Sequence, residues 1–183
     1  EAWSLTERKG NLRLRTHKVV QNVYEARNTI SQRMEGPRCM ASVTFDLNKM
    51  KDGDRCGFAA FNGHSGLLTI ARNDKDLTLT QSNTVVNLTD RDKAVTSVDE
   101  DIIETVTLKA KTVSLRIDAD FTPGKDIATF YYKVGNGEWH KIGKPYKMRF
   151  DYRRLFMGTR YAIFNYATKQ SGGYVDIDSF NYH

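Results

Sequence analysis

The fold is decided by residues 128–142, whose sequence is ATFYYKVGNGEWHKI. From Ala128 to Val134, every second residue is apolar or aromatic. This period of two is expected of a strand with one buried face. The run GNG follows at residues 135–137, and Asn and Gly accept the positive φ angles that tight hairpin turns require. This stretch therefore predicts an antiparallel β-hairpin.

The same alternation recurs along the chain. Val113, Leu115 and Ile117 alternate with polar residues, and near the start the sequence LRLR at 12–15 places its two leucines on one face and its two arginines on the other. Turn signals separate the runs at Asp52-Gly53, Asn62-Gly63, Pro123-Gly124 and Gly172-Gly173. Helical evidence is limited to a short turn within residues 22–33, and residues 145–157 are expected to form a loop. Many short strands between turns predict one all-β domain spanning residues 1–183, a sandwich or jelly roll of two antiparallel sheets.

Composition excludes two classes of partner. The formal charge of +6 and the pI near 9.3 would permit polyanion binding, but the basic residues are interleaved with apolar strand positions and form no tight cluster. We therefore expect no nucleic-acid partner. No apolar run approaches the roughly 20 residues of a transmembrane helix, so we expect no membrane partner.

Cys39 and Cys56 lie in apolar, strand-like runs and lack metal-ligand spacing. If these runs pair through the turn at Asp52-Gly53, the two cysteines are offset by several residues. Buried, unpaired thiols are therefore predicted, with a disulfide as the alternative.

Six segments, in order and at plausible spacings, carry a family resemblance that covers nearly the whole chain. They read SLTERKG (4–10), LRLR (12–15), ARNTISQR (26–33), DGDRCGFAAF (52–61), WHKIG (139–143) and GYVDIDSF (173–180). Together they resemble the C-terminal β-sandwich of glycoside hydrolase family 43 β-xylosidases and α-arabinofuranosidases.

The resemblance implies a concanavalin-like jelly-roll sandwich that does not carry catalytic carboxylates. It also implies a partner, an N-terminal five-bladed propeller that hydrolyses xylosides or arabinosides, for which 183 residues leave no room. In the family, an early loop of the sandwich helps to close the propeller's pocket. The matching stretch here is residues 17–28, with Tyr24 as the candidate aromatic side chain and Asn28 beside it. By this resemblance the chain is expected to be non-enzymatic, bacterial, and secreted or periplasmic.

Catalytic and metal chemistry find little support in the residues. A glycosidase needs two carboxylates across one sugar, and Asp176 and Asp178 share a strand face, while the acidic run 99–101 with Glu104 is typical of a solvated edge. The histidines show no zinc spacing, and we expect no cofactor, although a structural calcium ion at a strand end remains an alternative. The run GHSG at 63–66 is interpreted as a hairpin turn and not as a nucleophile elbow.

Glycan binding is the remaining chemistry, because sugars bind to aromatic platforms flanked by a few fixed polar groups. The run RYAIFNYA at 160–167 is the richest source. One face of that strand would carry Arg160, Ala162, Phe164 and Tyr166, and the other Tyr161, Ile163 and Asn165. Trp139 is also a candidate, although packing across the hairpin is its more ordinary role. The predicted carbohydrate-binding residues are Tyr24, Asn28, Phe61, Asn62, His64, Trp139, Arg160, Tyr161, Asn165 and Tyr166.

The sequence therefore predicts a non-catalytic, carbohydrate-binding accessory module of a hemicellulose-degrading enzyme, which contacts xylan or arabinoxylan and completes the pocket of a propeller domain. One alternative is a purely structural domain that docks on its catalytic domain. The other is a stand-alone glycan hydrolase, which would require a carboxylate pair inside a cleft.

Overall fold

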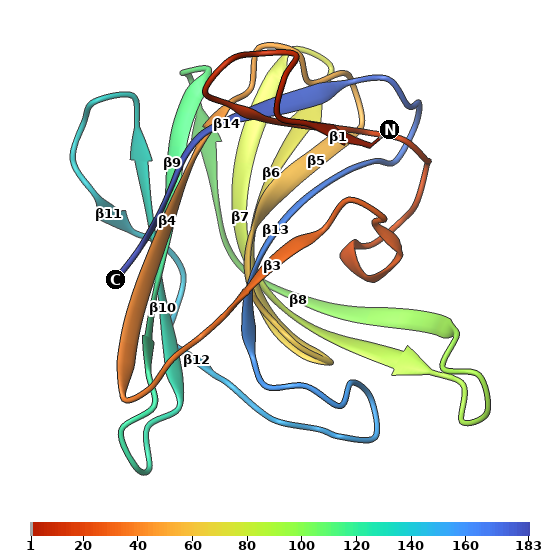
Figure 1. The fold of residues 1–183 in the computed structure, drawn as a ribbon, viewed down its shortest axis with the longest axis vertical. Coiled ribbons are helices and arrows are strands. Elements are labelled where there is room, and N and C mark those ends of the chain that lie inside the picture. The colour runs from red at the N-terminus through yellow and green to blue at the C-terminus, as the bar shows by residue number, and fades with distance from the viewer. Residues whose placement is uncertain (1) are drawn as a thin grey trace.

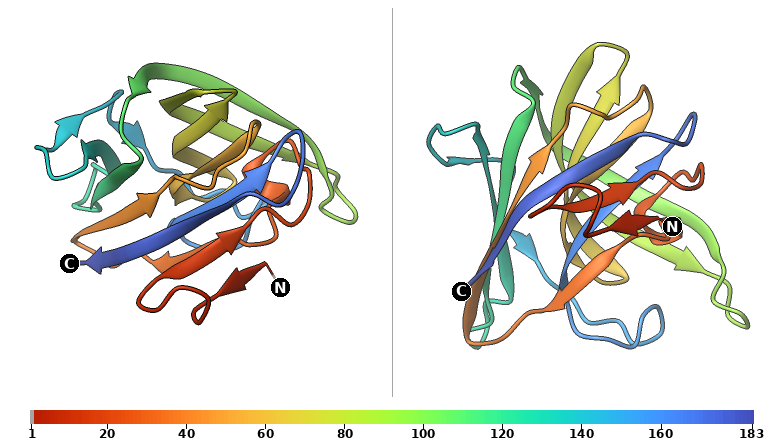
Figure 2. Two further views of the ribbon diagram at one scale, coloured as in Figure 1. Left: turned by 90° about the horizontal axis from the view of Figure 1, so that it is seen from above. Right: turned by 45° about the horizontal axis from the view of Figure 1, so that its top comes forward.

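The computed structural model describes residues 2–183 and consists almost entirely of antiparallel strands in two sheets (Figures 1 and 2). The first sheet, called sheet A, has the order β1 (Trp3–Ser4), β2 (Leu12–Arg15), β14 (Tyr174–Tyr182), β4 (Arg38–Asp46), β9 (Thr112–Asp120), β10 (Ile127–Val134) and β11 (His140–Lys141), with β12 (Tyr146–Lys147) also paired to β10. The second, sheet B, has the order β3 (Ile30–Arg33), β13 (Arg160–Ala167), β5 (Asp54–Phe61), β6 (His64–Asn73), β7 (Asp76–Leu88) and β8 (Val95–Leu108). The predicted sandwich of two antiparallel sheets is confirmed.

The core lies between the sheets and is built from the inward positions of each alternating strand. Phe45 and Ile117 of sheet A meet Phe58 and Leu68 of sheet B, and all four are fully buried. Burying one such side chain contributes on the order of 1.5–3 kcal/mol. The alternation in β10 is also confirmed, since Ala128 and Phe130 belong to this core and the next inward positions pack against its margin.

The hairpin predicted around residues 135–137 forms, with a wider turn than expected. Tyr131 pairs with Lys141 and Tyr132 with His140, so five residues separate the two strands. Only Gly135 of the GNG run has a positive φ, and the turn closes through the Gly137 N–H, which donates to the Val134 carbonyl. The predicted hairpin is therefore confirmed, but the positive φ angles expected across the GNG run are limited to Gly135.

Residues 22–33 contain one helical turn followed by a strand. A 3-10 helix, η1 (Val23–Glu25), is capped by the side chain of Asn22, which accepts from the N–H groups of Tyr24 and Glu25. The segment then extends into β3, where β-branched Ile30 suits a strand better than a helix.

Cys39 and Cys56 are buried and unpaired, as predicted. The assumption that their strands pair is wrong, because β4 belongs to sheet A and β5 to sheet B. Among residues 2–183, no helix is long and apolar enough to cross a membrane.

A second, smaller apolar cluster covers the outer face of sheet B. Ala59, Ala162 and Phe164 project from that face and are buried beneath Val20 and Val23 of the segment before β3. The connection from β2 to β3 is thus fixed to the sheet by apolar packing.

Candidate functional site

The side chains of β13 alternate between the two faces of sheet B, as predicted. Tyr161 and Ile163 point into the core between the sheets, whereas Ala162, Phe164 and Tyr166 lie on the outer face of sheet B. The inward position removes two candidate residues from any glycan surface. Tyr161 is 1% exposed and its hydroxyl donates to the Ile117 carbonyl, and Asn165 is 1% exposed and donates to the Leu14 carbonyl.

Tyr24 was predicted to project toward a partner domain, but its contacts lie within this chain. Its ring packs on Phe61 with centroids 5.2 Å apart. Its hydroxyl donates to the Asn62 carbonyl at 2.9 Å and lies 2.8 Å from the Ser65 hydroxyl. Burial raises the pKa of Tyr24, which keeps the hydroxyl protonated as a donor. Tyr24 therefore fixes its own loop to sheet B.

Asn28 and Asn62 are also internal braces. Asn28 is buried and its Nδ2 donates to the Arg15 carbonyl at 2.6 Å. Asn62 is fully buried, and its Nδ2 donates to the Met157 carbonyl at 2.7 Å, which connects the β5–β6 turn to the end of the loop between β12 and β13. Buried amides satisfied in this way stabilise the backbone around them and are not accessible to a ligand.

The remaining candidates are scattered. Trp139 packs against cations of its own sheet, with Lys133 Nζ 5.0 Å and Arg116 Cζ 5.9 Å from its ring. Arg160 donates to the Ser31 hydroxyl at the edge strand β3. Tyr166 is nearly buried and its ring lies 6.0 Å from that of Phe164. The structure does not bring these residues together with His64.

His64 lies at the centre of a groove that the sequence did not indicate. A cavity of about 470 Å³ between the β7–β8 edge and the β12 segment is lined by His64, Asp99, Asp101 and Arg149, among others. A second cavity of about 420 Å³ shares His64 and Arg149 and continues along residues 150–154. These two adjoining cavities are called the His64 groove below.

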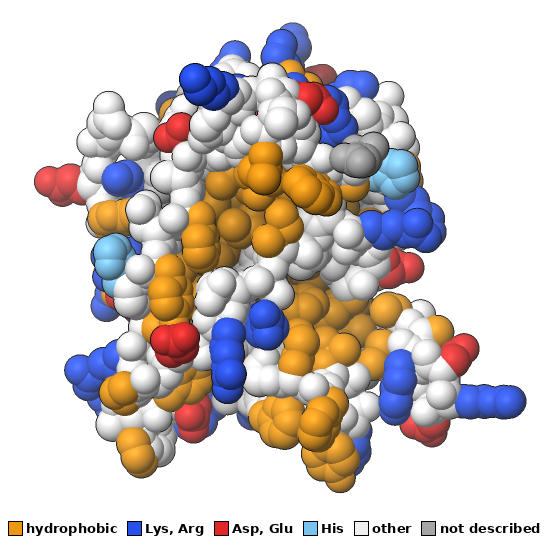
Figure 3. Space-filling view, viewed as in Figure 1, with side chains coloured by type: hydrophobic (Ala, Val, Ile, Leu, Met, Phe, Trp, Pro, Cys, Tyr) orange, Lys and Arg blue, Asp and Glu red, His pale blue; other side chains and the backbone are white. Residues whose placement is uncertain are grey.

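Exposed aromatic side chains gather beside this groove. The loop between β12 and β13 carries Phe150, Tyr152 and Phe156, which are 60%, 64% and 86% exposed. They are called the aromatic loop. Figure 3 shows hydrophobic side chains that protrude at the lower margin, where the β12–β13 connection lies in Figure 1. The signal in the sequence was RFDYRRLF at residues 149–156, three aromatic residues in a segment without strand alternation.

Polar contacts hold the base of the aromatic loop against sheet B. Arg154 forms an ion pair with Asp151, and its Nε donates to the Val86 carbonyl at 2.8 Å. Burial alone would raise the pKa of Asp151, but hydrogen bonds from Arg153 and Arg154 outweigh it and lower the pKa to about 2. His64 Nε2 lies 3.8 Å from the same carboxylate. Burial and the neighbouring Arg154 lower the pKa of His64, so the imidazole is neutral at pH 7.

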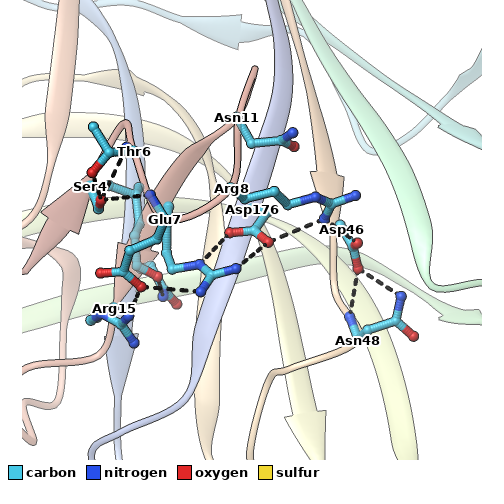
Figure 4. A network of polar contacts seen from close by, with 12 residues as sticks. Ser4, Thr6, Glu7, Arg8, Asn11, Arg15, Asp46, Asn48 and Asp176 are labelled. Carbon is cyan, nitrogen blue, oxygen red and sulfur yellow. Dashed lines mark hydrogen bonds and ion pairs between the residues drawn. The ribbon is translucent and has the colours of Figure 1, made fainter.

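Asp176 and Asp178 do not form a catalytic pair. Asp176 is held by Arg13 through Nε at 2.8 Å and by Arg8 at 3.1 Å, and a further ion pair links Arg8 to Asp46 (Figure 4). Asp178 instead lies at an irregularity of β14 and lines a different cavity. The network around Asp176 is structural and fastens the N-terminal strands to sheet A.

The acidic run 99–101 lies on β8, the edge strand of sheet B, as predicted for a solvated edge. Glu100 accepts a hydrogen bond from Ser82 at 2.7 Å, and Glu104 accepts one from the Gly143 N–H at 2.7 Å. Within residues 2–183, no group of three or more His, Cys, Asp or Glu side chains is placed to hold a metal ion.

Comparisons with known proteins agree on one kind of domain. The family model described as the β-xylosidase C-terminal concanavalin A-like domain matches residues 1–183. A β-xylosidase of Formosa agariphila is 26% identical over 210 aligned residues, which cover 98% of this chain and 31% of the relative.

Solved structures give the same result. A bifunctional GH43-CE protein of Bacteroides eggerthii matches with a TM-score of 0.86 and 34% identity, covering 100% of this chain and 22% of that chain. A GH43 glycoside hydrolase, engineered to display both endo-xylanase and exo-arabinofuranosidase activity, matches with a TM-score of 0.84 and 26% identity, covering 94% and 34%. The chain thus spans about a third or less of each of these relatives.

Proposed function

Because this chain belongs to the family of C-terminal concanavalin A-like domains of β-xylosidases, we propose that it is an accessory module of a hemicellulose-degrading glycoside hydrolase. It packs on the N-terminal catalytic propeller, contacts the xylan or arabinoxylan chain, and completes the substrate pocket. The observation that carries this proposal is the aromatic loop beside the His64 groove, since exposed apolar side chains and a polar groove meet on one surface.

The aromatic loop supplies the docking surface. Large exposed aromatic side chains that gather in one place mark interaction sites, because their burial against a partner is favourable. Phe150 and Phe156 lie with ring centroids 6.1 Å apart, so they present one continuous apolar surface. The Asn62 and Arg154 contacts hold the loop in place before any partner arrives, which lowers the entropic cost of docking.

The His64 groove supplies the contact with the sugar chain. Its lining combines the neutral imidazole of His64 with the carboxylates of Asp99 and Asp101 and the guanidinium of Arg149. Such donors and acceptors suit the hydroxyl groups of a glycan, and the neighbouring aromatic rings suit its C–H faces.

Hydrolysis by this chain alone is not part of the proposal. Asp99 and Asp101 project on one face of β8, and residues two apart on a strand are separated by roughly 6.6–6.8 Å. A glycosidase, however, encloses one carboxyl in an apolar environment so that it stays protonated. Asp99 and Asp101 lie exposed on an edge strand. We therefore expect no release of xylose or arabinose from oligosaccharides by residues 1–183.

Docking is tested by titrating residues 1–183 into the catalytic domain encoded by the same gene and expressed separately. We expect association, weakened at least tenfold by Phe156→Ser, because this side chain is the most exposed aromatic residue of the loop. Trp3→Ser is the matched control, since Trp3 is 50% exposed on the distant strand β1. Equal loss of affinity in both variants, or no association of the unaltered chain, contradicts the proposed docking surface.

Sugar contact is tested separately by calorimetric titration with xylohexaose, with Arg149→Ala as the variant. If xylohexaose gives a binding heat with the docked complex, and this heat is smaller with Arg149→Ala, the result supports sugar contact at the His64 groove. Docking without any heat from xylohexaose would instead favour the purely structural alternative.

A further inference from the structure

The charges that line the His64 groove are unevenly distributed along it. On β8 the groove is lined by the exposed carboxylates of Asp99 and Asp101, which are called the acidic wall below. Residues 149–154, called the basic end, contribute three arginines and one aspartate. Lys147 lies between them, but its ammonium group donates to the carbonyls of Gly124 and Lys125 and so points away from the acidic wall.

Asp151 does not neutralise the basic end. Its carboxylate accepts from Arg153 Nε at 3.2 Å and forms an ion pair with Arg154. One carboxylate cannot balance three guanidinium groups, so positive charge remains. The imidazole of His64 reports the same field. After burial, the charges of Arg154 and Arg149 are the largest causes of its lowered pKa, and each exceeds the opposing charge effect of Asp151.

The basic end also offers accessible hydrogen-bond donors. A guanidinium carries five N–H groups and accepts no hydrogen bond. Arg153 is 74% exposed, and beyond its Nε contact its terminal N–H groups make no hydrogen bond within residues 2–183. The exposed side chain of Arg149 forms neither a hydrogen bond nor an ion pair with residues 2–183. These two guanidinium groups are therefore available to a ligand.

A neutral sugar chain suits the acidic wall better than the basic end. Its hydroxyl groups can donate to Asp99 and Asp101, whereas a hydroxyl is a weaker acceptor for a guanidinium than a carboxylate is. A planar carboxylate accepts two parallel N–H bonds from one guanidinium. A chain with a carboxylate on every sugar would, however, bring like charges against the acidic wall. The lining thus favours a single carboxylate on an otherwise neutral chain.

We propose that the His64 groove recognises an acidic hemicellulose, a neutral xylan chain that carries single uronic acid substituents. The chain lies along Asp99 and Asp101, and the carboxylate of the substituent binds Arg149 and Arg153. Tyr152, which is 64% exposed and lines the same end, suits the C–H face of the substituent. This inference rests on the proposed function, because it names the substituent of the polysaccharide that the groove contacts.

The test is a titration of isotopically labelled residues 1–183 with two matched probes, followed by amide chemical shifts. The probes are xylotetraose and the same tetramer with one glucuronic acid substituent. We expect the acidic probe to bind at least fivefold more tightly, with shifts at residues 62–64, 99–101 and 149–154. Most of this preference should disappear at an ionic strength of about 1 M, where charges are screened within about 3 Å. A tetramer of galacturonic acid should bind more weakly than the substituted xylotetraose.

Two variants locate the carboxylate, since each removes one exposed guanidinium and changes the net charge equally. Arg153→Gln should reduce the preference for the acidic probe at least threefold and leave xylotetraose binding unchanged. Arg33→Gln is the matched control, because Arg33 lies on β3 and lines a different cavity. It should change neither affinity. The amide spectra report whether both variants are folded.

The outcomes separate this inference from the proposed function. If xylotetraose binds as tightly as the acidic probe, or if both variants lose the preference equally, the acidic substituent is not recognised here and the sugar contact still stands. If neither tetramer binds, the inference is also overturned, and the xylohexaose titration of the docked complex shows whether the sugar contact fails with it.

Discussion

Asp54 shows how a single buried charge can oppose the fold that contains it. The residue is fully buried at the start of β5, where one carboxylate oxygen accepts the Lys51 N–H at 2.7 Å. The other oxygen has no partner within the described part of the chain. Gly173 packs directly against this carboxylate, since a Cβ there would lie 1.8 Å from Asp54 Oδ2. Burial raises the pKa of Asp54 to about 6.

The raised pKa predicts that Asp54→Asn stabilises the chain above pH 6. The unfolded carboxyl titrates near 3.9, so the folded state binds the proton more tightly. The favourable contribution of the protonated Asp54 side chain to the free energy of unfolding is complete below about pH 4. It is lost as the pH rises through 6. The resulting cost in the unaltered chain is about 3 kcal/mol at pH 8 and about half that at pH 5. Urea unfolding should therefore show a gain for Asp54→Asn that is about 1 kcal/mol larger at pH 8 than at pH 5.

Asp101→Asn serves as the control for Asp54→Asn, because Asp101 is an exposed carboxylate on β8. Its stability relative to the unaltered chain should change little between the two pH values. A gain for Asp54→Asn that is equal at pH 5 and pH 8 would show that the carboxylate is not the cause.

Single residues were the hardest level to predict from the sequence. The alternation correctly placed Tyr161 and Tyr166 on opposite faces of β13, because successive side chains of a strand point to opposite faces. It could not say which face meets the other sheet, so buried Tyr161 and partly exposed Arg160 were equally good candidates. Asn62 was predicted to bind carbohydrate, but the tertiary contact with Met157 shows that its amide braces a loop.

At the scale of elements, the N-terminal strands β1 and β2 depend on ion pairs as well as on pairing. Leu14 is buried in the core, as predicted, and Arg13 points the opposite way. That outer face is not simply solvated, because Arg13 holds the carboxylate of Asp176 with two hydrogen bonds (Figure 4). The side chains are only 14% and 5% exposed, so water cannot replace either partner well.

Asp176→Asn should therefore destabilise the chain by about 3 kcal/mol at pH 7, since it leaves a largely buried guanidinium without its charge partner. Burial alone would raise the pKa of Asp176, but hydrogen bonds from Arg13 and Arg8 outweigh it and lower the pKa. The contribution is thus present above about pH 4 and is lost as the pH falls further. Urea unfolding of Asp176→Asn and of the unaltered chain measures this contribution to the free energy of unfolding.

Asp118→Asn is the matched control for this pair. Asp118 binds Arg116 with two hydrogen bonds of similar geometry, but the two side chains are 28% and 32% exposed. Exposed pairs contribute about 1 kcal/mol or less. If both variants lose the same stability, burial of the Arg13–Asp176 pair is not what makes it important.

Elements were predicted better than residues, because turn chemistry and strand alternation are local. The strands around Asn62-Gly63 and Pro123-Gly124 form as expected. The register shift in β14 was not predicted, since the run VDIDSF alternates regularly until the pairing with β4 is known. The aromatic loop was predicted as a loop, but its exposure depends on what packs around it.

At the scale of the whole molecule, the two sheets share one core. Its members come from β4, β9 and β10 in sheet A and from β5, β6 and β13 in sheet B. Separating the sheets would expose both apolar faces at once, so neither sheet has a core of its own. The sequence could predict this two-layer arrangement from many alternating strands, but not which strands join which sheet, because that depends on contacts distant along the chain.

A shared core predicts that the chain unfolds as one cooperative unit, and its two tryptophans can test this. Trp3 lies on β1 and Trp139 just before β11, and these strands are the opposite ends of sheet A. The variants Trp3→Phe and Trp139→Phe each leave a single fluorescent probe, at one end or the other. Both should unfold in urea at the same midpoint and with the same slope as the circular dichroism signal. The ion pairs of Arg8 and Arg13 would hold β1 and β2 to the sheet until the core itself opens. A Trp3 signal that changes at a lower urea concentration than the Trp139 signal would show instead that the N-terminal strands detach first.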